Sequence, residues 1–236
     1  MEALDTALTV NDVTYEQLAR SIDHSLLRPE LTLQDVMAGC ELANRYQVAS
    51  ACVRPADVSR CVAALADSSV AVCTVVGFPH GSHETATKVF EAERALAQGA
   101  TELDMVINIG WLRSREDALV EQDIRAVVDA ARDAALVKVI LENAYLDNDE
   151  KVRGCRLVEA AGAHFVKTST GFAPSGATFD DLRLMRRTVS ADVQVKAAAG
   201  VRSLDDLLAV LSLGVTRVGA TQTARILDDY RARSAA

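Results

Sequence analysis

The sequence predicts an α/β protein built as a (β/α)₈ TIM barrel, a single domain over residues 1–236 with a short N-terminal helix. Eight short apolar segments rich in β-branched residues alternate with longer amphipathic segments, as in a parallel barrel. Half of the residues are hydrophobic, so the chain can bury a full-sized core. No linker rich in Pro, Gly or Ser divides the chain. The alternative is an open doubly wound sheet, which the absence of a GxGxxG motif after the first strand disfavours.

The predicted elements follow one another in regular order. A short helix begins at a capping box formed by Thr14 and Gln17. The eight strands are expected at residues 21–26, 48–53, 70–76, 102–107, 136–141, 163–168, 193–198 and 216–220. Amphipathic helices are expected between them at residues 33–46, 83–99, 116–134, 148–162, 178–187 and 203–214. Gly99, Gly162 and Gly214 end three of these helices directly before the next strand, as C-terminal glycines often do.

Composition and charge exclude several classes of partner. The net charge is -8 and the basic residues are scattered, which argues against nucleic acid or an anionic membrane surface as the main partner. No run of about twenty apolar residues occurs, and the acidic N-terminus does not resemble a signal peptide. The five cysteines are odd in number and form no CxxC pair, so they are interpreted as reduced core thiols. We therefore expect a soluble, cytoplasmic protein.

Four ionisable residues occur near the ends of consecutive predicted strands that are otherwise almost apolar. They are Asp104, Glu142, Lys167 and Lys196, on the fourth to seventh strands. A single charged residue at a strand end is commonly an exposed edge or half of an ion pair, but four in sequence are harder to explain in that way. In a barrel the C-terminal ends of the strands converge on one mouth, where such enzymes place their chemistry. The sequence therefore predicts a catalytic site at this mouth.

The two lysines predict the chemistry. Alternation puts Lys167 and Lys196 in the barrel interior on adjacent strands, where two ammonium groups ~6 Å apart repel by roughly 3 kcal/mol. One of them would then lose its proton near neutral pH and attack a carbonyl, forming a Schiff base, while the other stays cationic. Asp104, on the same rim, is expected to relay protons through water.

An anion site is predicted beside these residues. Gly171, Gly200 and Gly219 follow the sixth, seventh and eighth strands, and a short final helix begins soon afterwards. Backbone N–H groups in such loops and at a helix N-terminus form the usual phosphate site of a barrel, although each glycine alone is also typical of a plain turn.

At these residues the sequence resembles the deoxyribose-phosphate aldolase family. The matching segments are IDHSLLRPELT, VVGFPHG, ELDMVINIG, VKVILE, FVKTSTGF, VKAAAGVR and TRVGA, which span nearly the whole chain in order. The resemblance implies a cofactor-free, metal-free class I aldolase that reversibly cleaves 2-deoxy-D-ribose 5-phosphate into acetaldehyde and glyceraldehyde 3-phosphate. Lys167 would be the Schiff-base lysine, Lys196 the cation that favours its neutral form, and Asp104 the proton-relay acid.

The resemblance also implies the substrate contacts and the assembly. Residues expected to bind the substrate are Asp23, Ser25, Cys52, Thr170, Gly171, Gly200, Gly219 and Thr221. The partners would be small sugar phosphates and aldehydes, and the protein would form a homo-oligomer, either a dimer or a tetramer.

The chain departs from the family pattern at several positions. Ala199 replaces the first of two glycines after the seventh strand, and Gln222 replaces the second of two serines after the eighth. Arg54 and Asn143 replace smaller or different polar residues expected beside the pocket, and Tyr230 cannot be equated with the C-terminal tyrosine that some members use. These departures concern substrate specificity, so an aldolase acting on a different or unphosphorylated aldehyde is the alternative function.

Two further classes remain open on the sequence alone. His80 and His83 in HGSH suggest a metal-dependent lyase or hydrolase, although two loop histidines without a carboxylate cluster are more often ordinary loop residues. A barrel that binds a sugar phosphate without cleaving it is the other, and retention of both lysines and Asp104 disfavours it.

Overall fold

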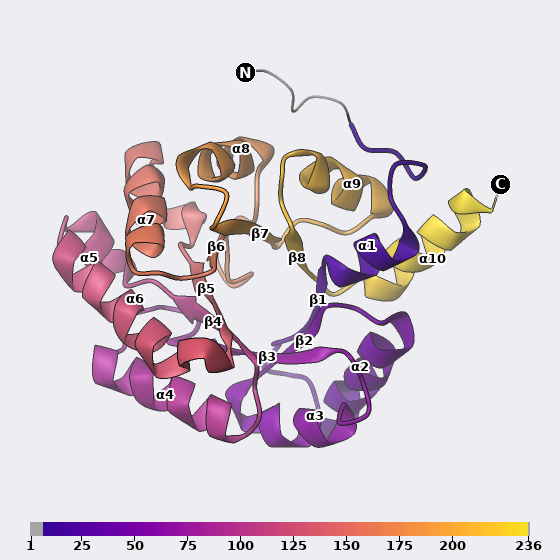
Figure 1. Ribbon diagram of the computed structural model, residues 1–236, viewed down its shortest axis with the longest axis horizontal. Helices are drawn as coiled ribbons and strands as arrows, with labels where there is room; N and C mark the ends of the chain where they lie inside the picture. Colours follow the sequence, from indigo (N-terminus) through magenta and orange to yellow (C-terminus); the bar gives the residue numbers. More distant parts are fainter. Residues whose placement is uncertain (1–6, 236) are drawn as a thin grey trace.

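The computed structural model describes residues 7–235, and these form a closed barrel of eight parallel strands in chain order. Figure 1 shows the strands as an inner ring and the helices around them. The strands are β1 Ile22–Leu26, β2 Ser50–Val53, β3 Ala71–Val76, β4 Glu102–Val106, β5 Leu136–Ile140, β6 Phe165–Lys167, β7 Gln194–Ala198 and β8 Arg217–Ala220. Strand β1 pairs with both β2 and β8, which closes the ring. The predicted (β/α)₈ fold is confirmed, and the doubly wound alternative is wrong.

Helices connect each strand to the next on the outside of the barrel. The α-helices are α1 Tyr15–Arg20, α2 Leu33–Tyr46, α3 Val58–Ala64, α4 Thr85–Ala97, α5 Ile109–Arg113, α6 Asp117–Ala131, α7 Asn148–Ala160, α8 Phe179–Thr188, α9 Leu204–Ser212 and α10 Thr223–Ser234. Three 3₁₀ turns, η1 Pro55–Asp57, η2 Arg132–Ala134 and η3 Asn143–Tyr145, complete the described elements. Helices α3 and α5 were not predicted from the sequence, because helices this short show little periodicity.

Local signals in the sequence set the helix ends. The predicted capping box is present: the Thr14 hydroxyl accepts a hydrogen bond from the Gln17 backbone, and the Gln17 side chain accepts one from the Thr14 backbone. Gly99, Gly162 and Gly214 have positive φ angles of 96°, 80° and 79°, which supports their predicted place after the helices. Helix α1 packs beside α10, so the first and last described helices lie together (Figure 1).

The apolar core lies mainly between the strands and the surrounding helices. Its members come from strand residues that face outward, such as Leu103 and Val139, and from inward helix faces, such as Val36 and Ile124. A second, smaller apolar cluster lies inside the barrel and comprises Leu27, Cys52, Cys73 and Val75, with Phe78 packed against it. Much of the remaining interior is charged, which is unusual for a barrel whose centre is normally filled by branched apolar side chains.

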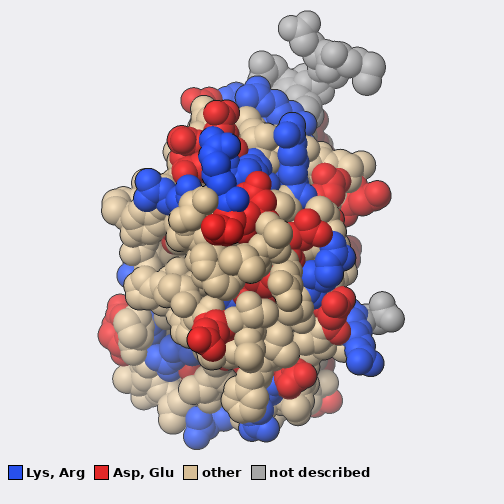
Figure 2. Space-filling view, turned by 90° about the vertical axis from the view of Figure 1, so that its left-hand side faces the viewer, with Lys and Arg blue, Asp and Glu red and all other residues tan. Residues whose placement is uncertain are grey.

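The face of the molecule drawn in Figure 2 is mixed in charge. On this face, acidic and basic side chains are interspersed and separated by uncharged residues. Mixed charge of this kind does not create the single-sign field that attracts nucleic acid. No helix among residues 7–235 is long and apolar enough to cross a membrane.

Candidate active site

A cavity of about 330 Å³ opens at the C-terminal mouth of the barrel. Ten of the residues that the sequence singled out line it: Asp23, Ser25, Cys52, Lys167, Thr170, Gly171, Lys196, Gly200, Gly219 and Thr221. Asp104 is fully buried directly beneath the two lysines rather than in the cavity wall. The structure therefore brings the three expected catalytic residues and the eight expected substrate contacts to one place, whereas Glu142 lies outside the cavity wall.

Lys167, Lys196 and Asp104 form a compact triad. The Nζ atoms of both lysines lie 2.6 Å from the same oxygen, Oδ2 of Asp104. Lys167 is the last residue of β6, whereas Lys196 and Asp104 are the middle residues of five-residue strands. The expectation that all of them stand at strand ends is therefore wrong for these two, which lie in the middle of their strands.

Asp23 belongs to the same cluster. Its Oδ2 atom lies 2.5 Å from Nζ of Lys196, so this lysine bridges two carboxylates. Its Oδ1 atom accepts hydrogen bonds from the Ser50 hydroxyl at 2.7 Å and from Nε of Arg217 at 2.9 Å. Because Asp23 is itself fully buried, it fixes the position of the Lys196 ammonium group.

Three charged residues that the sequence analysis missed complete the network. Nζ of Lys138 lies 2.8 Å from Oδ1 of Asp104 and 2.7 Å from Glu102, and Arg217 lies 2.7 Å from Glu102. The signal for them was the alternation of strand residues. Glu102 stands two positions before Asp104, and Lys138 pairs in register with Asp104, so their side chains enter the barrel as well.

The charges of this network perturb one another strongly. Burial alone would raise the pKa of Asp104, but the ammonium groups of Lys138, Lys167 and Lys196 outweigh it and hold that pKa well below its usual range. Burial alone would lower the pKa of Lys196, but Asp104 and Asp23 outweigh it and raise that pKa above its usual value. Lys138 behaves in the same way, with Asp104 as its strongest partner. Lys138 and Lys196 are therefore cations and Asp104 is a carboxylate at neutral pH.

Lys167 differs from the other cations of this network. Among the described ion pairs, Lys167 contacts one carboxylate, whereas Lys138, Lys196 and Arg217 each contact at least two. Four cationic groups face three carboxylates, those of Asp23, Glu102 and Asp104, so loss of one proton makes the cluster neutral. Lys167 is the cation of this cluster with the fewest carboxylate contacts, and it also lines the cavity.

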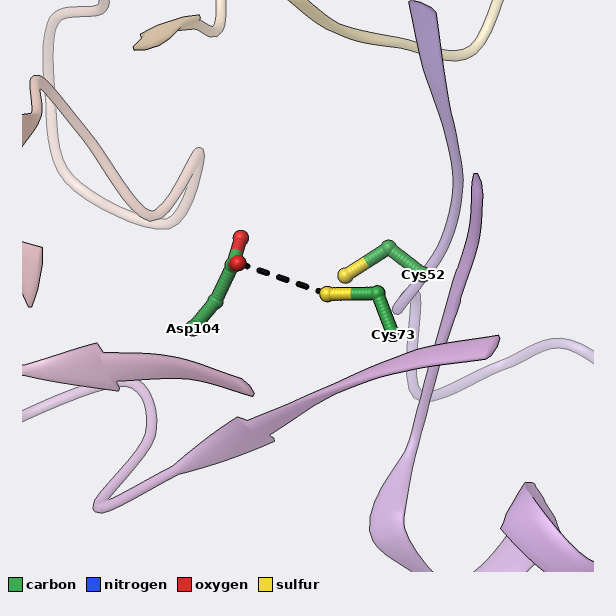
Figure 3. A group of neighbouring side chains, drawn as sticks. All are labelled: Cys52, Cys73 and Asp104. Atoms are coloured by element: carbon green, nitrogen blue, oxygen red, sulfur yellow. Dashed lines mark hydrogen bonds between the residues drawn. The ribbon is translucent and has the colours of Figure 1, made fainter. Parts of the chain in front are cut away.

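One group of described side chains has the chemistry of a metal site. The potential ligand atoms of Cys52, Cys73 and Asp104 lie within 4.8 Å of one another (Figure 3). The lysine ammonium groups bound to Asp104 repel a further cation there, so we assign this carboxylate to the lysines. Neither His80 nor His83 belongs to such a group within residues 7–235.

Glu142 has a different place from the one the sequence suggested. It lies two residues beyond β5, in a left-handed conformation with φ 57°, and does not line the cavity. Its Oε2 atom accepts hydrogen bonds from the backbone N–H of Thr170, at 3.2 Å, and from the Thr170 hydroxyl. Burial raises the pKa of Glu142. It therefore holds the loop after β6 from behind.

The anion end of the cavity is built from loops as predicted, with one strained residue. Ala199 has φ 59°, in the left-handed region that favours glycine, and is followed by Gly200 with φ 141°. The family pattern of two glycines is therefore replaced by an alanine that adopts the same region at a cost of about 1 kcal/mol. Helix α10 begins at Thr223, two residues after Thr221 in the cavity wall, so its N-terminus lies beside this end.

Arg54 and Asn143 do not line the cavity, so the expectation that they stand beside the pocket is wrong. Arg54 forms an ion pair with Asp57 at 2.7 Å and donates to backbone carbonyls of the loop after β1, including Leu31 at 2.9 Å. The side-chain nitrogen of Asn143 lies 3.3 Å from the sulfur of Met185. Both residues support loops behind the site.

A closed parallel barrel with ionisable side chains at its C-terminal mouth defines a (β/α)₈ enzyme, here one equipped for amine chemistry. Residues 16–226 match the profile of the DeoC/LacD family of aldolases, and the chain belongs to this family. It is accordingly an aldolase, a carbon–carbon lyase.

Individual relatives agree with this assignment. The chain is 50% identical over 217 residues to deoxyribose-phosphate aldolase 1 of Oceanobacillus iheyensis, covering 92% of this chain and 98% of the relative. It is 52% identical over 205 residues to deoxyribose-phosphate aldolase of Shouchella clausii, covering 86% and 92%. Among solved structures, the tetrameric deoxyribose-phosphate aldolase of Aeropyrum pernix matches with a TM-score of 0.84 and 29% identity, covering 93% of each chain.

Proposed function

We propose that this aldolase reversibly cleaves 2-deoxy-D-ribose 5-phosphate into acetaldehyde and D-glyceraldehyde 3-phosphate through a Schiff base on Lys167. The observation that supports this most directly is the position of Lys167, which lines the cavity and shares one oxygen of Asp104 with the cation Lys196. The substrate is taken from the relatives, which are deoxyribose-phosphate aldolases at about half identity over more than nine-tenths of their length.

Lys167 acts as the nucleophile. Its neutral amine adds to the aldehyde carbon of the open-chain sugar, and loss of water gives a protonated imine. The imine withdraws electrons from the carbon–carbon bond one position further along, so this bond breaks and glyceraldehyde 3-phosphate leaves. The remaining enamine takes a proton on carbon, and water then releases acetaldehyde and the free lysine.

Lys196 and Asp104 provide the charge and the proton transfers. Lys196 stays cationic because Asp23 and Asp104 both bind it, and its charge disfavours protonation of Lys167. Asp104 contacts the Lys167 nitrogen at 2.6 Å, so it can pass protons to and from that nitrogen directly or through a water.

The phosphate of the substrate binds at the loops after β6, β7 and β8. These loops place Gly171, Gly200 and Thr221 around one end of the cavity, beside the N-terminus of α10. Backbone N–H donors do not depend on side-chain identity, so the replacements Ala199 and Gln222 weaken this site without removing it. The unphosphorylated sugar is therefore expected to be a poorer substrate.

Borohydride trapping tests the proposal. Reduction in the presence of acetaldehyde converts the imine into a stable secondary amine, and the chain has five lysines at which mass spectrometry can search for it. We expect one adduct, on Lys167, and none in Lys167→Leu. Lys151→Leu is the matched control, because Lys151 pairs with Asp181 away from the cavity. An adduct on another lysine, or cleavage without any adduct, would overturn the proposal.

We also propose that the enzyme forms a homo-oligomer in a reducing compartment such as the cytoplasm. The Aeropyrum pernix relative is described as a tetramer, and the five cysteines of this chain are free and buried. Sedimentation of the reduced protein distinguishes a monomer from a dimer or a tetramer.

A further inference from the structure

Two cysteines lie side by side at the cavity, Cys52 in its wall and Cys73 directly behind it. Cys52 on β2 and Cys73 on β3 are partners in the register of these neighbouring parallel strands. Their sulfur atoms lie within 4.8 Å of each other, and Figure 3 shows both pointing into the same space in front of Asp104. Neighbouring strands lie about 4.8 Å apart, which falls within the Cα separations of roughly 4.4–6.8 Å that disulfides span. The strand spacing and the proximity of the two sulfurs therefore permit a bond between them once the side chains rotate.

The cavity exposes the two thiols unequally. Cys52 lines the cavity, whereas Cys73 lies behind it with no exposed surface. A small solute that enters the mouth of the barrel therefore meets the sulfur of Cys52 first. Cys40, Cys61 and Cys155 are buried in the core outside the barrel and do not line the cavity.

The surroundings favour a thiolate at Cys52. The pKa of Cys52 is lowered, because the Cys73 thiol can hydrogen-bond to it and because Lys196 and Lys167 lie nearby. The Cys73 thiol has one hydrogen, so it donates either to the Cys52 sulfur or to Oδ1 of Asp104, 3.3 Å away. Burial raises the pKa of Cys73 well above its usual value. Cys52 is thus the attacking thiol of the pair, and Cys73 is the protonated partner.

We propose that Cys52 and Cys73 form a peroxide-sensitive site, in which a hydroperoxide converts the pair into a disulfide and switches the aldolase off. The Cys52 thiolate attacks one peroxide oxygen, the O–O bond breaks, and the other oxygen leaves as water or an alcohol after taking a proton. The product is a sulfenic acid at Cys52. The sulfur of Cys73 then attacks the sulfur of Cys52, the S–O bond breaks, and hydroxide leaves as water with the Cys73 proton. Two thiols lose two electrons, and one peroxide gains them.

The disulfide alters the environment of Asp104. It removes the S–H group that donates to Oδ1 of Asp104, and it turns the Cys73 sulfur toward β2. Nζ of Lys138 lies 3.5 Å from the Cys73 sulfur, so it loses this contact as well. With these two contacts changed, the Asp104 carboxylate shifts relative to the Lys167 amine that it contacts, so turnover falls. This loss of activity rests on the function proposed above, whereas formation of the bond does not.

Peptide mapping of the full-length protein tests the bond. The reduced enzyme is treated with hydrogen peroxide under native conditions, free thiols are alkylated, and the protein is digested without reduction by trypsin and Asp-N. Asp-N cleaves before Asp67 and so separates Cys61 from Cys73. We expect a linked peptide pair containing Cys52 and Cys73 that dithiothreitol splits, with activity falling in proportion to the linked fraction and returning on reduction.

The chain supplies its own control in Cys40 and Cys61. These thiols are also close enough to hydrogen-bond to each other, but neither lines the cavity, so peroxide should leave them unlinked. Cys73→Ala should stop oxidation at the sulfenic acid, which dimedone traps at Cys52, while Cys155→Ala should link as the parent does. Linking of Cys40 to Cys61 as readily as Cys52 to Cys73, or inactivation without any Cys52–Cys73 bond, would overturn the proposal. A linked enzyme with full activity would overturn the switch. If the protein lacked aldolase activity altogether, the mapping would still decide whether the bond forms.

Discussion

Replacing Lys196 with leucine tests whether its charge keeps Lys167 reactive. Both Nζ atoms lie 2.6 Å from one oxygen of Asp104, so the two nitrogens are at most about 5.2 Å apart. At this distance, with an effective dielectric constant of ~20, two unit charges repel by about 3 kcal/mol. In Lys196→Leu this repulsion is gone. Asp104 also no longer shares its Oδ2 atom between two lysines, so it binds the Lys167 ammonium group more strongly. The neutral amine of Lys167 is therefore disfavoured by about 3 kcal/mol relative to the parent.

The expected result is a slow enzyme that recovers toward alkaline pH. A penalty of about 3 kcal/mol corresponds to roughly a hundredfold lower kcat/KM at neutral pH. The penalty shrinks at alkaline pH, where ammonium groups lose their protons, so the rate of Lys196→Leu should approach that of the parent as the pH rises. Steady-state cleavage of deoxyribose 5-phosphate between about pH 6 and pH 10 measures both quantities.

Two further variants separate charge from packing. Lys196→Arg keeps the cation, so its pH profile should remain close to that of the parent even if its rate falls. Arg217→Gln removes a cation from the same network, but Arg217 contacts Asp23 and Glu102 rather than Asp104. A shift in Arg217→Gln as large as that in Lys196→Leu would refute the pairwise reasoning, as would a parent-like profile and rate in Lys196→Leu.

The remaining predictions concern four variants. Lys167→Leu should abolish cleavage and leave a folded barrel by circular dichroism, since it removes the amine and keeps the apolar volume; substantial cleavage by the folded variant contradicts the assignment. Asp104→Asn should slow turnover by roughly 10² or more. Because the fold lowers the pKa of Asp104, its carboxylate stabilises the fold above about pH 4, and this stabilisation is lost as the pH falls. The free energy of unfolding of Asp104→Asn should consequently fall less than that of the parent between about pH 5 and pH 3, and equal slopes would argue against it. Lys138→Met leaves Asp104 short of a buried partner and should lower the free energy of unfolding in urea by about 3–5 kcal/mol, whereas a loss below about 1 kcal/mol would show that the remaining cations compensate. The double variant Ala199→Gly, Gln222→Ser should lower KM for the phosphorylated sugar and leave the unphosphorylated sugar nearly unchanged; equal improvement of both, or of neither, rules out our description of the anion end.

The fold and the reactive triad could be predicted because local patterns encode them. Strand spacing, glycine helix ends and the order of elements are sequential properties, and the eight predicted strands all occur. Strand alternation also placed Lys167 and Lys196 inside the barrel, and Asp104 follows from its position on β4. For each of these residues, the alternation along its own strand is enough to predict that the side chain points into the barrel.

The rest of the site depends on several strands at once. Lys138 and Arg217 stand in the middle or at the beginning of strands, where attention to strand ends does not find them, and their partners lie far away in sequence. The position of Asp104 beneath both lysines is set by the relative register of the barrel strands rather than by any sequence motif. The backbone conformation of Ala199 could not be predicted either, since its positive φ contradicts the local preference of alanine and is imposed by the surrounding loops.

The separation between the outer core and the charged interior explains how this barrel can hold a reactive amine. Nearly all the buried apolar side chains pack between the strands and the helices, so the hydrophobic contribution to stability comes mainly from outside the ring. Buried charges contribute little net stability, because desolvation offsets their attraction even when every group is paired. The interior can therefore be arranged for reactivity: it holds one cationic residue more than carboxylates, and Lys167 is the one that contacts a single carboxylate. Lys167→Leu removes the surplus positive charge of this cluster and leaves no buried carboxylate without a partner, because Asp104 keeps Lys138 and Lys196. For this reason we expect loss of cleavage together with retention of the fold.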